Sequence, residues 1–374
     1  FASATNSHNT AIGANAGEKL EEGVQNTLVG SLAGDNLVDA ANNTALGYLA
    51  LGAVTGNQNT ALGSQSLVAN TGVDNTATGY AAGNAISSGG RNTIVGSFAA
   101  LLATDPDDSV IIGFEAAAGA ILTGHDNVII GSSAGHDLTS GNSNVLIGRD
   151  AGDKTDDGNS LVAIGFRALG ANCGDSNVAI GIQALESTTS AENTAVGSSA
   201  GFSLTNVSGG VFIGRHAGLY ATTAANSTFV GHNAGQGITG TKLTGDGNTA
   251  IGKDAGLVLQ GGAANNTFLG QGAGLAITTG DANVYIGRKA GFTGTTARLN
   301  TFVGDEAGGL STGAQNAFFG NDSGYAMTTG GKNTIIGSFS GNQNNLDYRA
   351  ESNNIVLSDG DGNPKFYSNS TGST

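Results

Sequence analysis

The side chains that could carry out acid–base chemistry or bind metal ions are few and widely spaced in this 374-residue chain. The histidines are His8, His125, His136, His216 and His232, and only the last two lie about one length of the internal repeat (described below) apart. Histidine rings bind transition metals when their nitrogens converge on one point. Because His216 and His232 occupy different positions within their repeats, we expect them to face in different directions and to bind no metal ion.

Acidic residues gather in three short segments that could bind calcium or act as catalytic pairs. They are Asp105, Asp107 and Asp108, then Asp153, Asp156 and Asp157, and finally Asp359 and Asp361. The last segment, SDGDGN, is similar to a calcium loop, but the spacing of its oxygen ligands is incomplete and the bidentate glutamate is missing. Hydrolysis of a glycan requires two carboxylates facing each other across a cleft, whereas these segments read as short turns. We therefore expect solvated turns, with no catalytic residue, no cofactor, no metal site and no enzyme activity.

The composition excludes several classes of protein. Glycine accounts for 64 residues and proline for 2, without the three-residue glycine period of collagen, and glycine weakens helix interiors by about 1 kcal/mol per residue. The net charge of −15 repels nucleic acid and anionic lipid, and no apolar run reaches the ~18 residues of a membrane span. We therefore expect no nucleic-acid partner and no membrane insertion. The single cysteine, Cys173, cannot form an intrachain disulfide and is expected to be a small buried side chain.

The elements that position these residues are copies of a short internal repeat. Its signature is Asn, then Thr or Val, two apolar residues, Gly, two variable residues, Ala and usually Gly, as in NVIIGSSAG from Asn127. We call the glycine that follows the two apolar residues the anchor glycine. There are 20 copies, with a mean spacing of about 17 residues. The anchor glycines are Gly13, Gly30, Gly47, Gly63, Gly79, Gly96, Gly113, Gly131, Gly148, Gly165, Gly181, Gly197, Gly214, Gly231, Gly252, Gly270, Gly287, Gly304, Gly320 and Gly337.

Each repeat predicts one short β-strand and tight corners. The residue before the anchor glycine is Ile, Val or Leu in 18 of the 20 copies, and the residue three before it is Thr or Val in nearly all. These two positions share one face of a strand, and β-branched side chains suit a packed sheet, so we expect this face to point into the coil. The residue three after the anchor is always Ala or Ser, which indicates a tight inner corner. The predicted fold class is an all-β β-solenoid, or β-roll, of about 20 coils with a period of about 17 residues.

Asparagine precedes the anchor glycine by four residues in 16 copies, which predicts a structural ladder of side-chain amides along the stacked coils. A binding role for this row would also produce the periodicity. The residues predicted to form the Asn ladder include Asn9, Asn26, Asn43, Asn59, Asn75, Asn92, Asn127 and Asn144.

The residue two before the anchor glycine is apolar in nearly every copy, and it belongs to the opposite face of the strand. One coil can enclose only one of two apolar faces, and soluble monomers rarely leave a long apolar stripe uncovered. We therefore expect copies of the same chain to cover it around a symmetry axis. The alternative is a flat monomer that buries the stripe with its own loops. The predicted seam residues are Ile94, Ile111, Ile129, Leu146, Phe212, Phe229, Phe268, Tyr285, Phe302 and Phe318.

From residue 9 to about residue 341, these motifs resemble the Asn-Thr-Ala-Ile-Gly repeats of phage and prophage tail fibre shafts. They are also similar to the Ser-Val-Ala-Ile-Gly head repeats of trimeric autotransporter adhesins, whose period is shorter. The C-terminal segment SNNIVLSDGDGNPKFYSNSTGST resembles the stretch that often follows fibre repeats. The resemblance implies a homotrimeric fibre shaft on a virion, with other tail proteins and a host surface glycan or protein receptor as partners. Its second branch implies a trimeric adhesin on an extracellular bacterial surface.

We divide the chain into a lead-in of residues 1–8, a solenoid shaft of residues 9–345 and a non-repeat segment of residues 346–374. The predicted function is the structural shaft of a trimeric phage tail fibre in host attachment. The alternatives are a bacterial surface trimeric adhesin, an ice-binding rod and a β-solenoid polysaccharide depolymerase. Regular Thr rows favour an ice-binding rod, but we expect the Thr row to point inward with the Ile row. A depolymerase would need a carboxylate-lined cleft that the sequence does not predict.

Overall fold

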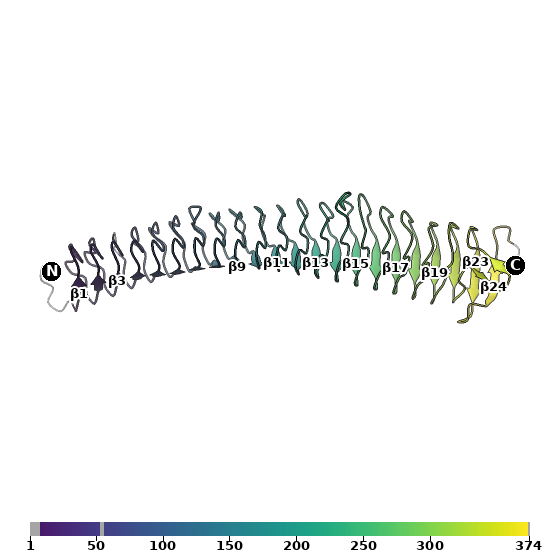
Figure 1. The fold of residues 1–374 in the computed structure, drawn as a ribbon, viewed down its shortest axis with the longest axis horizontal. Coiled ribbons are helices and arrows are strands. Elements are labelled where there is room, and N and C mark those ends of the chain that lie inside the picture. The colour runs from purple at the N-terminus through teal and green to yellow at the C-terminus, as the bar shows by residue number, and fades with distance from the viewer. Residues whose placement is uncertain (1–7, 53–55, 373–374) are drawn as a thin grey trace. The chain divides into compact units, whose positions relative to one another are not determined.

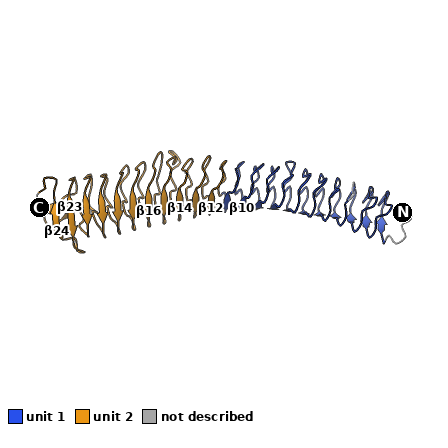
Figure 2. Ribbon diagram, turned by 180° about the vertical axis from the view of Figure 1, so that it is seen from behind, with its two compact units in different colours: residues 1–183 blue, residues 184–374 orange. Residues whose placement is uncertain are grey.

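The computed structural model describes residues 8–52 and 56–372. These residues form 24 short β-strands and no helix, so none of them belongs to a helix that is long and apolar enough to cross a membrane. Figure 1 shows each turn of the chain contributing one strand, with successive strands side by side. The predicted all-β solenoid with a period of about 17 residues is confirmed. The chain divides into two compact units, residues 1–183 and residues 184–374 (Figure 2).

Unit 1 is a parallel stack of three-residue strands. Each strand pairs with the next in register, so that Thr10 lies beside Thr27 and Ile12 beside Val29. Its strands are β1 (Thr10–Ile12), β2 (Thr27–Val29), β3 (Thr44–Leu46), β4 (Thr60–Leu62), β5 (Thr76–Thr78), β6 (Thr93–Val95), β7 (Val110–Ile112), β8 (Val128–Ile130), β9 (Val145–Ile147), β10 (Val162–Ile164) and β11 (Val178–Ile180).

Unit 2 continues the same pattern and ends in a different arrangement. Its parallel strands are β12 (Thr194–Val196), β13 (Val211–Ile213), β14 (Thr228–Val230), β15 (Thr249–Ile251), β16 (Thr267–Leu269), β17 (Val284–Ile286), β18 (Thr301–Val303), β19 (Ala317–Phe319) and β20 (Thr334–Ile336). A small hairpin of β21 (Asn342–Gln343) and β22 (Leu346–Asp347) follows. Strand β23 (Ile355–Ser358) then pairs in parallel with β20, and β24 (Pro364–Ser368) pairs antiparallel with β23.

The anchor glycines let successive coils approach closely. Gly30 has a φ of 134°, a left-handed value that side chains disfavour, and a Cβ there would lie 2.4 Å from the carbonyl oxygen of Gly47. The Gly30 N–H donates to the carbonyl of Ile12 in the preceding coil at 2.8 Å. Glycine is required at this position because any Cβ would collide with the backbone of the next coil.

The core of each coil holds several rows of buried side chains. The middle residue of β2–β20 points inward, and the small residue three after the anchor glycine, such as Ala33 or Ala134, is also fully buried. In unit 2, aromatic middle residues stack along their row. The ring centroids of Tyr285 and Phe302 are 4.8 Å apart, and those of Phe302 and Phe318 are also 4.8 Å apart. Stacking at the strand repeat distance fills the core without voids.

The predicted seam was placed on the wrong face of the strand. The ten predicted seam residues are middle strand residues and are fully buried inside their own coils: Ile94, Ile111, Ile129, Leu146, Phe212, Phe229, Phe268, Tyr285, Phe302 and Phe318. The first and third residues of the strands face solvent instead. Ile12 is 61% exposed and Ile336 is 49% exposed. A two-residue period shows which side chains share a face, but it does not show which face points inward when both are apolar.

Candidate binding surfaces

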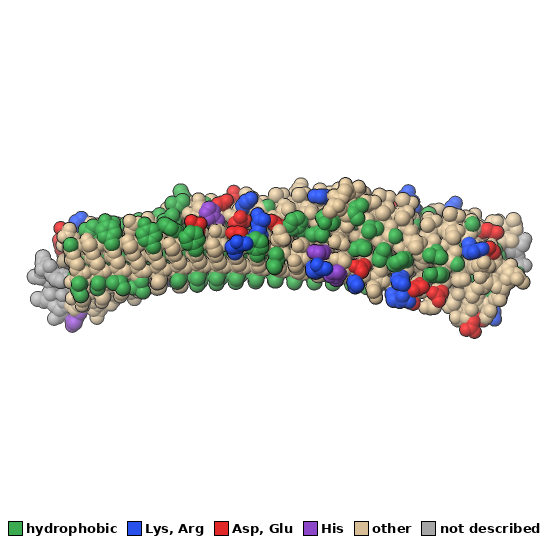
Figure 3. Space-filling model, in the orientation of Figure 1, with side chains coloured by type: hydrophobic (Ala, Val, Ile, Leu, Met, Phe, Trp, Pro, Cys, Tyr) green, Lys and Arg blue, Asp and Glu red, His purple; other side chains and the backbone are tan. Residues whose placement is uncertain are grey.

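The outward face of the strands forms a two-row apolar surface in each unit, which we call the outer stripe. Its first row holds the first residue of each strand and its second row holds the third residue. None of the outer-stripe residues of β1–β20 is charged. Figure 3 shows a nearly continuous row of hydrophobic side chains along the edge of unit 1 where the strands lie. A continuous uncharged stripe of this kind is typical of a contact surface.

The composition of the first row changes along unit 1. Six in-register threonines occupy β1–β6, beginning with the pairs Thr10–Thr27 and Thr27–Thr44. Valine occupies the same row in β7–β11, beginning with the pair Val110–Val128. The second row stays aliphatic except at Thr78. The stripe therefore has a hydroxyl-bearing section and a fully aliphatic section.

The outer stripe extends beyond the repeats in unit 2. Ile355 of β23 pairs with Thr334 in the first row, and Leu357 pairs with Ile336 in the second. Phe366 of β24 lies beside Leu357 although β24 runs in the opposite direction. Ile355 and Phe366 are 46% and 48% exposed. Strand β23 keeps the Asn and apolar residues of the repeat but has Ser358 in place of the anchor glycine, while β24 has no repeat sequence and still presents Phe366 on this face.

The predicted ladder asparagines lie in a row of buried hydrogen bonds, with Asn9 half-buried at its start. The Asn43 N–H donates to Asn26 Oδ1 at 2.9 Å, and Asn26 Nδ2 donates to the carbonyl of Ala40 at 2.8 Å. Where Ser109 replaces Asn, its hydroxyl oxygen accepts the Asn127 N–H at 3.2 Å. The row occupied by Asn9, Asn26, Asn43, Asn59, Asn75, Asn92, Asn127 and Asn144 joins coil to coil, and its amide groups are engaged within the chain.

The histidines form no metal site within residues 8–52 and 56–372, where no cluster of three ligand-type side chains occurs. The expectation that His216 and His232 face apart is wrong, because their ring centroids lie 6.5 Å apart. Arg215 places a guanidinium nitrogen 2.7 Å from His232 Nε2. Burial, followed by the charge of Arg215, lowers the pKa of His216. The coil repeat brings the rings together, and the neighbouring cation opposes the protonation of His216.

The acidic segments cap turns of neighbouring coils. Asp108 pairs with Arg91 at 2.6 Å, and Asp107 accepts the N–H of Gly90 at 2.6 Å. A hydrogen bond between the carboxyl groups of Asp156 and Asp157 lowers the pKa of Asp156 and raises that of Asp157. These ion pairs and hydrogen bonds give the acidic residues a structural role in the turns.

Asp359 and Cys173 also have partners within the chain. In the SDGDGN turn, Asp359 accepts hydrogen bonds from the N–H groups of Asp361 and Asn363 and pairs with Lys365 at 3.0 Å. The Cys173 thiol is buried, which raises its pKa, and lies 3.7 Å from the Thr155 hydroxyl.

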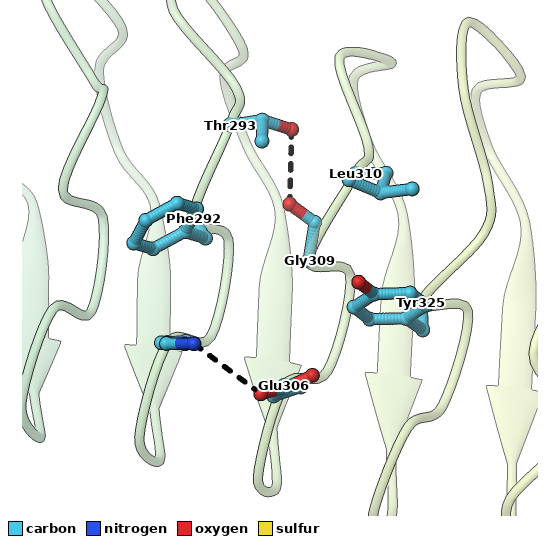
Figure 4. Close-up of a pocket in the computed structure, with 7 residues that line it drawn as sticks. Phe292, Thr293, Glu306, Gly309, Leu310 and Tyr325 are labelled. Atoms are coloured by element: carbon cyan, nitrogen blue, oxygen red, sulfur yellow. Dashed lines mark hydrogen bonds and ion pairs between the residues drawn. The ribbon is translucent and has the colours of Figure 1, made fainter.

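Among the surface cavities of the described residues, two that are lined by aromatic side chains lie outside the outer stripe, one in each unit. The cavity in unit 2 measures about 180 Å³, and Figure 4 shows Phe292, Leu310 and Tyr325 around it with Glu306 at its rim. The cavity in unit 1 measures about 260 Å³ and is lined by Phe98, Leu101, Glu115, Ala118 and His136. Sequence reasoning missed both, because their lining residues are adjacent only after successive coils stack.

The sequence matches no protein-family model and no curated protein.

Proposed function

We propose that the chain is the structural shaft of a homotrimeric phage tail fibre that takes part in host-cell attachment. The observation that carries this proposal is the uncharged outer stripe on the parallel sheet of each unit. The resemblance of the repeats to those of tail fibres supplies the setting and the number of copies.

The outer stripe calls for a partner with the same repeat. Water-exposed aliphatic side chains such as Ile12 and Leu46 recur at every strand spacing, and burying them yields about 25 cal/mol per Å². A second copy of the chain carries its outer-stripe side chains at the same spacing. The two rows of one copy can therefore align with those of the other copy, coil by coil. A cyclic arrangement covers the stripe of every copy equally and leaves no unpaired surface.

The C-terminal strands also support self-association. Strand β23 keeps the Asn and three apolar residues of the repeat, and Asn354 continues the Asn ladder, whereas β24 lies outside the repeat pattern. Leu357 and Phe366 are exposed apolar residues that continue the second row of the stripe. The face that we propose for contact between copies therefore extends onto β24, where the repeat sequence has ended.

The proposed place of the chain on a phage tail is tested by locating the chain on intact particles. Gold-coupled antibodies raised against the purified chain should label a thin fibre on the virion tail, where other tail proteins adjoin it. Label spread over a bacterial surface would favour the alternative of a trimeric adhesin. Label on neither would overturn both.

A second candidate function is an ice-binding rod, and one observation favours it. The Thr row was expected to point inward, yet Thr10, Thr27 and Thr76 are exposed on a flat parallel sheet. Regularly spaced outward hydroxyls and methyl groups could order water. Thermal hysteresis of a dilute solution of the chain tests this role, with a Thr60→Lys variant as the control that interrupts the row. Freezing-point depression no larger than that of the variant would dismiss it.

A further inference from the structure

We infer that the two small surface cavities are equivalent binding slots for a single pyranose ring of a neutral carbohydrate. The inference rests on the proposed role in attachment for the source of its ligand, a surface glycan. It does not depend on the number of copies, because each slot is built from one chain.

The slot of unit 2 arises from a gap in a row of side chains. The row consists of the residues five positions after the anchor glycines, and in three successive coils these are Phe292, Gly309 and Tyr325. Gly309 has no side chain, and a Cβ there would lie 2.8 Å from Cδ2 of the Tyr325 ring. The Tyr325 ring reaches over the position that a Gly309 side chain would fill, and the cavity lies beside this position, bordered by Phe292, Leu310 and Tyr325 (Figure 4).

Polar groups border this hollow on one side. Glu306, two residues after its anchor glycine, lies 3.7 Å from the ammonium of Lys289. Both side chains reach solvent, so the carboxylate can accept and the ammonium can donate hydrogen bonds. The floor is fixed, because the Thr293 hydroxyl donates to the carbonyl of Gly309 at 2.9 Å.

The slot of unit 1 has the same construction from a different set of residues. The corresponding row holds Leu101, Ala118 and His136, again a small residue between two large ones. The His136 ring lies across the next backbone position, where a Cβ on Gly119 would come within 2.0 Å of it. Glu115 occupies the position that Glu306 occupies in unit 2. A small residue between two larger ones, with a glutamate two positions after the anchor glycine, is therefore found at one cavity in unit 1 and at one cavity in unit 2.

Two other small residues in this row provide a natural comparison. Gly170 lies between Asp153 and Glu186, and Gly52 lies between Asp35 and Val68, so neither is flanked by large apolar or aromatic residues on both sides. A small residue in this row is therefore not sufficient to form a slot, which also needs large flanking side chains and a glutamate at its edge.

The chemistry of the slots selects the ligand. Aromatic walls pack against flat apolar surfaces, and the glutamate and its polar neighbours can bind hydroxyl groups at the edge of such a surface. A pyranose ring combines C–H faces with a hydroxyl-bearing edge. Glu115 opposes phosphate and other anions in the slot of unit 1. In unit 2, Glu306 is paired with Lys289 at 3.7 Å and with Arg288 at 3.0 Å, so charge does not select an anion there. The volumes of about 180 and 260 Å³ lie below the roughly 300–1,000 Å³ of pockets for drug-sized ligands, which fits one ring.

The test fills the gaps in the full-length chain. Binding of cellohexaose, maltohexaose and chitohexaose is measured by isothermal titration calorimetry for the wild-type chain and for a Gly309→Leu, Ala118→Leu double variant. Leucine occupies the same row at Leu101, Leu219 and Leu275, and the φ of Gly309 lies outside the left-handed region. Because a Cβ at residue 309 would lie 2.8 Å from the Tyr325 ring, that ring must turn aside, and the circular dichroism spectrum and urea midpoint of the filled variant are compared with those of the wild type to establish that it folds. We expect at least one oligosaccharide to bind the wild-type chain and the filled variant to bind it at least tenfold more weakly.

Two control variants separate the outcomes. Gly170→Leu fills a gap without apolar walls and should bind as the wild type does, while Glu306→Gln with Glu115→Gln keeps the shape of the slots and should weaken binding several-fold. The inference is overturned if none of the three oligosaccharides binds, if the filled variant binds as tightly as wild type, or if N-acetyl-tyrosinamide binds in their place. A normal oligomeric mass alongside any of these results would leave the proposed fibre intact.

Discussion

Gly218 lies directly against the ring of Phe212, so closely that a Cβ on Gly218 would come within 2.4 Å of Phe212 Cδ1. In the coil of β10 the same two positions hold Ala163 and Leu169, and in the coil of β11 they hold Ala179 and Leu185. In these three coils the large middle strand residue is paired with glycine and the alanine is paired with leucine, whereas Ala77, Ala195 and Ala250 are also paired with glycine. In the coils of β10, β11 and β13 the two positions therefore share a similar volume inside the coil.

Exchanging the sizes of this pair should preserve the core. Phe212→Ala alone removes a buried ring and should lower the free energy of unfolding by about 3–5 kcal/mol. Adding Gly218→Leu should recover most of that loss, because Leu169 and Leu185 adopt positive φ at the same position with φ of 52° and 50°. Urea unfolding of the single and double variants measures both changes. A double variant no more stable than Phe212→Ala would contradict the shared-volume account.

The Asn ladder should contribute strongly to stability at single positions. Asn144 is fully buried, accepts the N–H of Leu161 at 2.8 Å and donates to the carbonyl of Gly158 at 2.9 Å. Asn144→Ala leaves both of those buried groups unpaired and should cost about 2–5 kcal/mol. The exposed Asn321 is the control, and Asn321→Ala should change stability by less than about 0.5 kcal/mol. Equal effects of the two substitutions on the urea midpoint would show that the ladder is not stabilising.

The turn between β23 and β24 should loosen in acid. The ammonium of Lys365 and the hydrogen bonds from Asn363 lower the pKa of Asp359 to about 2. Because the folded-state pKa is lowered, the stabilisation is complete above the ordinary carboxyl pKa of about 4 and is lost as the pH falls towards 2. Amide hydrogen exchange of residues 355–368, corrected for its intrinsic pH dependence, should show protection falling over that window. In Asp359→Asn, the protection should no longer change between pH 4 and pH 2, and an unchanged acid response in this variant would refute the assignment.

A charge on the outer stripe should disrupt self-association. Ile251 is the third residue of β15 and is 36% exposed in the single chain. In a cyclic trimer, Ile251→Lys would bring several ammonium groups into an apolar seam, where uncompensated charges are costly. The assembled fraction measured by size-exclusion chromatography with light scattering should fall. Ile121→Lys, at an exposed isoleucine outside the strands, should leave it unchanged, and the reverse pattern would place the contact surface elsewhere.

The repeat and the fold class were predictable because their signals are local. The spacing of anchor glycines, the strand apolar pattern and the small residue at positions such as Ala33 each constrain one coil, and twenty copies repeat the constraint. The row of asparagines was visible for the same reason. Each of these features follows from the chemistry of one residue type at one position in the coil.

The direction of each strand face could not be predicted in the same way. Ile111 and Ile112 are neighbours of identical chemistry, yet the first is fully buried and the second is partly exposed. What decides between them is volume, since the middle residue must share the coil interior with the residue four after the anchor glycine. That pairing, as in Ala163 with Leu169, spans the anchor corner and has no periodic signature within one strand. The two cavities were hidden too, because Phe292 and Tyr325 flank Gly309 only when three coils are stacked.

The central claim is that copies of the chain cover one another's outer stripes. Sedimentation equilibrium of the purified full-length chain in native buffer measures the mass of the assembled species directly. The account predicts a single species at three times the 36.6 kDa mass of the chain. A stable species of 36.6 kDa that does not associate as the protein concentration rises would contradict it.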